Sequence, residues 1–237
     1  MSRLLSISVI HVRYKIYSYS LNLYQLERRN DIPLSRSSTS PKSDTVSSLH
    51  KKALKFQKDG NQEEAMIQLD KALDIEPNNA ELLYDKAISL QMLLRFDDAI
   101  EYYNKSLKID PSNFGALVNK GLCLSNPNTN KHEEALLCFD QALRLTPDDP
   151  GALSLRGYSL DSIGKYREAI DCFDKILETQ PKEVNILINK GLALSHLGKY
   201  DEAIAYFDTV LDYEPDNFFA AQLKQEAAKS MKRDFMQ

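Results

Sequence analysis

Residues 150–183, PGALSLRGYSLDSIGKYREAIDCFDKILETQPKE, and residues 184–217, VNILINKGLALSHLGKYDEAIAYFDTVLDYEPDN, are two copies of one pattern. Aligned without a gap, the two segments share Leu at position 4, Gly at position 8, Ala at position 20, Phe at position 24 and Pro at position 32. Matches between residues of such different chemistry indicate an array of similar structural units rather than one irregular core.

The same pattern extends upstream and predicts five units, 46–79, 80–113, 114–149, 150–183 and 184–217. Three residue types mark these units at matching positions: Pro77, Pro111, Pro147, Pro181 and Pro215; Ala65, Ala99, Ala135, Ala169 and Ala203; Leu49, Leu83, Leu117, Leu153 and Leu187. The third unit holds two extra residues, which fall within the segment 125–130.

Each unit reads as two helices joined by a turn. The similar residues at positions 4, 8 and 11 have helical spacing and share one face of the first helix, and those at positions 20, 24 and 28 share one face of the second. The small residues at positions 8 and 20 let two antiparallel helices approach closely, and the proline ends the second helix because it lacks a backbone N–H. A single hairpin buries too little apolar surface to offset its ordering entropy, so the units must stack.

This pattern resembles the tetratricopeptide repeat over residues 46–217. The family has a large residue at position 4, a small one at 8, a large one at 11, Ala at 20, an aromatic at 24, a small residue at 27 and Pro at 32. The chain departs from it with Leu in place of Trp at position 4 and with Ile176 and Val210 at position 27. The resemblance implies an all-α fold, a right-handed superhelical α-solenoid of antiparallel helix hairpins. After Pro215, an apolar face on residues 218–232 predicts one more helix, so we expect residues 218–237 to form a C-terminal capping helix and tail.

Composition and motifs argue against catalysis. The chain has 43% hydrophobic and 27% charged residues and a net charge of −4, typical of a folded protein. It contains no Gly-rich phosphate loop, no metal-ligand spacing and no nucleophile motif. No apolar run is long enough for a membrane span, and an acidic body disfavours nucleic acid. We therefore expect a non-enzymatic protein without a cofactor, a metal or a nucleic-acid partner.

The N-terminal residues differ from the rest of the chain. Residues 1–45 hold 7 of the 30 Lys/Arg and 3 of the 34 Asp/Glu, a local charge of +4. Residues 1–34 remain unassigned, because their composition resembles an organelle transit peptide while their alternation of polar and apolar residues does not. The alternatives that we expect for them are a disordered segment, a cleaved segment or a start-site extension. Residues 35–45 read as a Ser/Thr-rich flexible linker. Three cysteines without a pairing pattern favour the cytoplasm, with an organelle as the alternative if residues 1–34 are a transit peptide.

The resemblance places a peptide-binding groove on the first helix of each unit, at positions 2, 5, 6, 9, 12 and 13. In this sequence the candidate groove residues are Tyr84, Ile88, Met92, Val118, Asn119, Leu122, Leu155, Tyr158, Ile188, Asn189 and Leu192. Asn119 and Asn189 can donate to and accept from a peptide backbone, although Asn at this position also suits a helix surface. The apolar positions either line the groove or pack on the next repeat. Residues 125–130 are either a lengthened turn or a contact point at the groove rim.

Within the family that this chain resembles, one subfamily binds the acidic tail of heat-shock chaperones through a carboxylate clamp of Lys, Arg and Asn. The corresponding positions in the first frame are His50, Leu54, Asp85, Gly115 and Asn119, and the other two frames also lack the cations. A heat-shock chaperone tail is therefore disfavoured.

The sequence favours an adaptor or scaffold that holds an apolar or amphipathic segment of a partner protein. The alternatives are a structural subunit of a larger or self-associating assembly and an accessory to an enzyme carried on another chain.

Overall fold

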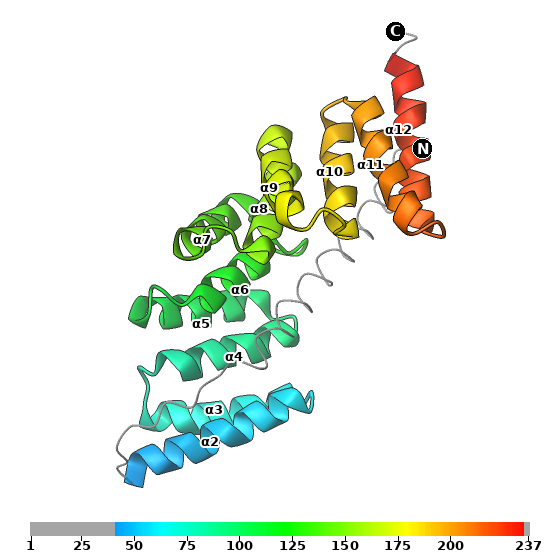
Figure 1. The fold of residues 1–237 in the computed structure, drawn as a ribbon. Helices are drawn as coiled ribbons and strands as arrows, with labels where there is room; N and C mark the ends of the chain where they lie inside the picture. The colour runs from blue at the N-terminus through cyan, green and yellow to red at the C-terminus, as the bar shows by residue number, and fades with distance from the viewer. Residues whose placement is uncertain (1–40, 235–237) are drawn as a thin grey trace. The chain divides into compact units, whose positions relative to one another are not determined.

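The computed structural model describes residues 41–234, and its helices form two compact halves, residues 41–145 and residues 146–234. Within these residues all regular structure is helical. The first half contains α2 (Pro41–Lys58), α3 (Gln62–Ile75), α4 (Ala80–Met92), α5 (Phe96–Ile109), α6 (Phe114–Ser125) and α7 (His132–Leu145). The second half contains α8 (Pro150–Ser162), α9 (Tyr166–Thr179), α10 (Val184–His196), α11 (Tyr200–Tyr213) and α12 (Phe218–Asp234). Figure 1 shows consecutive helices running side by side as hairpins.

Helix α2 begins at Pro41, which differs from the predicted linker at 35–45. Residues 41–45 belong to the helix because proline is tolerated in the first turn, where its missing N–H has no helical partner. The interpretations given for residues 1–34 lie outside the described residues.

Close contact between the two helices of a hairpin explains the small residue at position 8. A Cβ added to Gly121, Gly157 or Gly191 would lie 2.5 to 2.6 Å from a ring carbon of Phe139, Phe173 or Phe207 respectively. These three rings, at position 24 of their repeats, are at most 1% exposed. The predicted pairing of a small residue with a large aromatic one is therefore the centre of these three hairpins.

The turn between the two helices of a repeat needs one residue in the left-handed region. Gly60, Gly164 and Gly198 occupy this position with φ of 81° to 82°, and glycine adopts it without steric cost. In the second repeat the same position is Leu94, with φ of 60°, and in the third it is Asn130, with φ of 51°. Leu94 is also 64% exposed, so no packing offsets its backbone strain.

The two extra residues of the third repeat form a turn that is closed by its own hydrogen bonds. The Thr129 hydroxyl lies 2.6 Å from the carbonyl oxygen of Cys123 and 2.9 Å from that of Leu124, at the end of α6. The backbone N–H of Lys131 donates to the Leu124 carbonyl at 2.8 Å. The insertion thus satisfies carbonyl groups that a helix end would otherwise leave unpaired.

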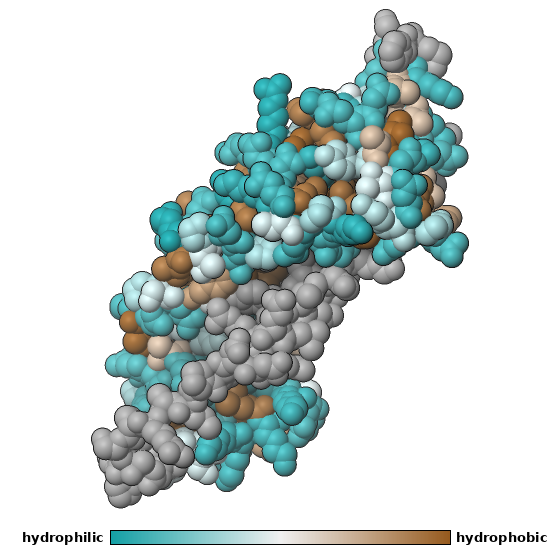
Figure 2. Space-filling view, in the orientation of Figure 1, coloured by the Kyte–Doolittle hydropathy of each residue, from teal (hydrophilic) through white to brown (hydrophobic). Residues whose placement is uncertain are grey.

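Successive hairpins stack through the second helix of one repeat and the first helix of the next. In the first half α3 packs on α4 and α5 on α6, and in the second half α9 packs on α10 and α11 on α12. Ala220, Leu223 and Ala227 bury the apolar face of α12 against the last hairpin, which is the packing that the predicted capping helix requires. Figure 2 shows a largely hydrophilic outer surface on the visible face of the described residues, with small, separated hydrophobic patches.

Candidate binding surface on the first helices

We use "first-helix face" for positions 2, 5, 6, 9, 12 and 13 of α2, α4, α6, α8 and α10, the first helices of the five repeats. All predicted groove residues belong to this face. Tyr84, Ile88 and Met92 lie on α4, Val118, Asn119 and Leu122 on α6, Leu155 and Tyr158 on α8, and Ile188, Asn189 and Leu192 on α10. Each half therefore carries its own set of candidate groove residues.

The predicted groove residues differ in accessibility. Met92 is 43% exposed, Tyr84, Ile88, Tyr158 and Leu192 are half-buried, and the other six are buried. Tyr84 and Ile88 pack against the core around Tyr103, and Ile188 belongs to the core that also holds Phe207. These three apolar residues thus have a packing role within their own half. Whether they also contact a partner stays a prediction.

The two asparagines at position 6 are buried amides with incomplete hydrogen bonding. Asn119 is 2% exposed, and its Nδ2 donates to the Tyr84 hydroxyl at 3.2 Å, which joins α6 to α4. Its Oδ1 has no hydrogen-bond partner among the described residues. Asn189 is 7% exposed, and its Nδ2 likewise has no hydrogen-bond partner among the described residues. An unpaired buried polar atom is costly, and a ligand that supplies the missing bond removes this cost.

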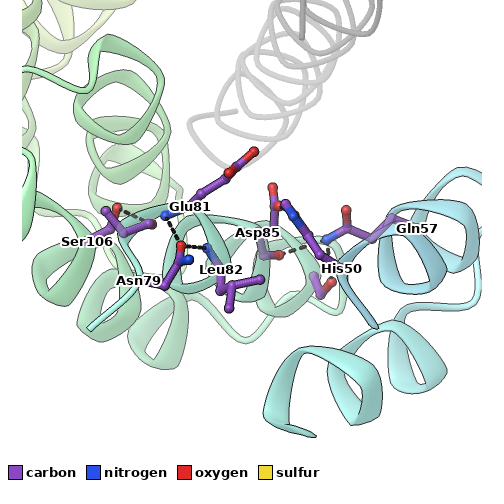
Figure 3. Close-up of polar contacts among 9 residues, drawn as sticks. His50, Gln57, Asn79, Glu81, Leu82, Asp85 and Ser106 are labelled. Atoms are coloured by element: carbon purple, nitrogen blue, oxygen red, sulfur yellow. Dashed lines mark hydrogen bonds and ion pairs between the residues drawn. The ribbon is translucent and has the colours of Figure 1, made fainter. Parts of the chain in front are cut away.

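A polar cluster that sequence reasoning missed joins α2 to α4 (Figure 3). The Nε2 atom of His50 lies 2.5 Å from Oδ2 of Asp85, and both side chains are largely buried, with 15% and 9% exposure. Gln57, also on α2, donates from Nε2 to the Asp85 carbonyl oxygen and to the Ser89 hydroxyl, both at 2.8 Å. The cluster fixes the position of the Asp85 carboxylate on the first-helix face.

The charge of this cluster depends on pH. Desolvation lowers the pKa of His50, but the hydrogen bond that His50 donates to Asp85 and the negative charges of Asp85 and Glu81 outweigh it, so the pKa lies above the ordinary 6.5. The positive form of His50 is therefore favoured beside Asp85. Figure 3 shows the side chains of Glu81, Asp85 and His50 on the same side of α4.

Contacts between neighbouring first helices follow one spacing in sequence. His50 contacts Asp85, Tyr84 contacts Asn119, and Asp161 contacts His196 at 2.9 Å, and in each pair the residues are 35 positions apart. The repeat has 34 residues, so each pair joins one position of a repeat to the following position of the next repeat. These contacts could have been predicted from the sequence. Pairing each residue with the one 35 positions later, one more than the repeat length, matches His50 with Asp85 and Asp161 with His196.

The described residues were searched for metal-ligand groups and for reactive thiols. No group of three His, Cys, Asp or Glu side chains in them is arranged to hold a metal ion. Cys123, Cys138 and Cys172 are unpaired and buried, and burial raises the pKa of all three thiols, so none is an activated nucleophile. Among the helices described, none combines the length and apolar character needed to cross a bilayer.

Comparison with solved structures shows the same fold. MamA (residues 41 to the end) from Desulfovibrio magneticus RS-1 superposes with a TM-score of 0.70 and 23% identity, covering 76% of this chain and 99% of that one. A tetratricopeptide repeat protein from Parabacteroides merdae ATCC 43184 gives a TM-score of 0.73 and 22% identity over 81% of this chain and 76% of that one. YrrB, described as a TPR protein with an unusual peptide-binding site, gives 0.69 and 19% identity over 79% and 100%.

Sequence comparison identifies the repeats directly. No curated protein matches the chain. Models of the tetratricopeptide repeat match residues 46–79, 80–113, 128–182 and 154–218, which together span most of the described helices. The chain therefore belongs to the tetratricopeptide repeat family.

Proposed function

We propose that this protein is a non-enzymatic adaptor that holds an apolar or amphipathic segment of a partner protein on its first-helix face. The fold is that of a protein-interaction scaffold, in which stacked repeats present an extended surface. The observation that carries the proposal is the pair of buried amides at Asn119 and Asn189, each with one atom lacking a hydrogen bond among the described residues. A backbone amide of a bound segment supplies the N–H or C=O that such an atom requires.

The surroundings of the two amides favour an apolar partner. Val118 and Leu122 flank Asn119, and Ile188 and Leu192 flank Asn189, on the same faces of α6 and α10. Apolar side chains around a few fixed polar groups are typical of peptide-binding surfaces. The three unpaired cysteines support a reducing compartment such as the cytoplasm.

The proposal is tested by photo-crosslinking from defined positions of the full-length chain. A photoreactive phenylalanine replaces Met92 on the first-helix face of one half or Tyr158 on that of the other. Matched controls carry it at Ile67 or Leu137, which are 51% and 65% exposed on second helices. We expect a partner to be crosslinked from Met92 or Tyr158 and not from the controls, and to be lost with Asn119→Ala and Asn189→Ala.

The crosslinked bands are identified by mass spectrometry, and circular dichroism verifies that each variant is folded. If the control positions on the second helices crosslink equally well, the partner binds the opposite face. Retention of every crosslink in the doubly substituted chain would refute the role of the two amides.

A further inference from the structure

In the first half, neighbouring first helices contact each other through position 5 of one repeat and position 6 of the next. His50 on α2 lies 2.5 Å from Asp85 on α4, and Asn119 on α6 donates to the Tyr84 hydroxyl of α4 at 3.2 Å. In both pairs a long side chain at position 5 spans the distance between the two helices. That side chain supplies a polar partner for the residue at position 6.

The second half has a much shorter side chain at the same place. Its first helices α8 and α10 contact each other, as α4 and α6 do in the first half. They carry Ser154 at position 5 and Asn189 at position 6. Asn189 is 7% exposed, and its Nδ2 has no hydrogen-bond partner among the described residues. The serine therefore does not supply the acceptor that the phenol of Tyr84 supplies to the amide of Asn119.

The surroundings of Asn189 favour a neutral acceptor on an apolar group. Positions 2, 5, 6 and 9 of α8 and α10 hold no charged residue, and Tyr158 and Leu192 at position 9 are half-buried. The adjoining cations, Arg156 and Lys190, both bond to side chains of α9. A charged acceptor would lose its hydration here without gaining an opposite charge, whereas a neutral oxygen pairs the free N–H at little cost.

We infer that Ser154 and Asn189 form a subsite for a tyrosine side chain of the bound segment. The phenol oxygen of that tyrosine accepts the hydrogen bond from Asn189 Nδ2, in the way that the Tyr84 hydroxyl accepts the one from Asn119. The inference rests on the proposed function and specifies a residue that the partner carries. A phosphotyrosine is rejected, because it brings negative charge to a surface without a free cation.

The inference is tested with three matched sets of immobilised peptides of about twelve residues and the full-length chain. All sets share the same arrangements of Leu, Ile, Ser, Gln and Asn, and differ only in one central residue, which is Tyr, Phe or phosphotyrosine. We expect the chain to bind the Tyr set about fivefold more tightly than the Phe set, because phenylalanine leaves the buried amide unpaired. The phosphotyrosine set should bind more weakly than the Phe set.

Two variants locate the effect. Asn189→Leu removes the donor and is expected to reduce the Tyr-to-Phe preference to about twofold or less. Ser154→Tyr/Asn185→Gly fills the subsite with a phenol of the chain itself and should abolish the preference. The glycine is included because a Cβ on Gly115, at the matching position of α6, would lie 2.7 Å from the Tyr84 hydroxyl.

The matched control is Asn104→Leu, the same substitution at an exposed residue of the second helix α5, and it is expected to retain the full preference. Circular dichroism verifies that each variant is folded. The two subsite variants change different residues, so either one tests the inference if the other is poorly folded.

The outcomes separate this inference from the proposed function. Equal binding of the Tyr and Phe sets, or a preference for phosphotyrosine, overturns the tyrosine subsite and leaves the adaptor function standing. A preference for Tyr that survives both Asn189→Leu and Ser154→Tyr/Asn185→Gly also overturns it, because the phenol would then bind elsewhere. Absence of binding to every set contradicts peptide binding by the first-helix face altogether.

Discussion

The ammonium group of Lys190 lies 4.4 Å from the ring centroid of Tyr206, on the second helix of its own repeat, and donates a hydrogen bond to the Tyr206 hydroxyl at 2.5 Å. The same ammonium forms an ion pair with Asp174 on the preceding repeat. Lys190 therefore connects a first helix to both second helices beside it. The contact fixes how one hairpin stacks on the next.

The arrangement recurs because its lysine is part of the repeat. Position 7 is basic in all five repeats and at the matching position of α12: Lys52, Lys86, Lys120, Arg156, Lys190 and Lys224. Lys86 pairs with Asp70 and lies over Tyr102 in the same way, and Lys224 pairs with Asp208 at 2.5 Å. The cap thus docks through the same ion pair as a complete repeat.

The stacking lysines are expected to differ in their contribution to stability according to burial. Lys190→Met should lower the free energy of unfolding by about 1 kcal/mol, a value reduced for the partial exposure of Asp174. Lys224→Met should change it by less than about 0.5 kcal/mol, because Lys224 and Asp208 are 42% and 45% exposed. Urea unfolding followed by circular dichroism measures both, and equal losses would contradict the role of burial.

Gly191→Ala is expected to destabilise the last hairpin by about 1–3 kcal/mol, because the added methyl overlaps the Phe207 ring, as in overpacked cores. The first repeat accommodates Ala at this position beside a Leu, in the pair Ala53 and Leu69. The double variant Gly191→Ala/Phe207→Leu should therefore lose less stability than the sum of the two single variants. Strict additivity in thermal and urea unfolding would show that the two positions do not meet.

Leu94→Gly is expected to raise the free energy of unfolding by about 0.5–1 kcal/mol, since glycine removes the steric cost of a φ of 60°. Leu94→Ala is the matched control, because it removes the same exposed side chain and retains the strained backbone. Its stability should stay within about 0.5 kcal/mol of the parent. A Gly variant no more stable than the Ala variant would place the strain elsewhere.

The contact of His50 with Asp85 predicts a pH-dependent contribution to stability. The folded-state pKa of His50 lies above 6.5, so the contribution is fully present below pH 6.5 and is lost as the pH rises through the folded-state value. The stability difference between the parent chain and His50→Gln should therefore decrease as the pH rises from 6 to 9. Urea titrations at each pH measure it, and NMR titration of the His50 ring reports its pKa directly. A stability difference between the two proteins that grows with pH would contradict this prediction.

The fold can be predicted from the sequence alone, because it follows from positions within one repeat. The pairing of Gly191 with Phe207, 16 residues apart, is local to a hairpin and was predicted by small and aromatic residues at a fixed spacing. The capping helix was predicted in the same way, from an apolar face that follows the last proline. Helical period and side-chain size are sufficient for such predictions, since they act between neighbouring helices of one chain segment.

The contacts between side chains of different repeats depend on how the helices pack in three dimensions. His50 and Asp85 occupied clamp positions in the sequence, yet their contact depends on the lateral offset with which α4 packs beside α2. That offset shifts the pairing by one residue from the repeat period and brings together charges that look isolated along the chain. Whether a polar atom such as Asn119 Oδ1 finds a partner likewise depends on distances of a few tenths of an ångström between helices, which residue spacing does not specify.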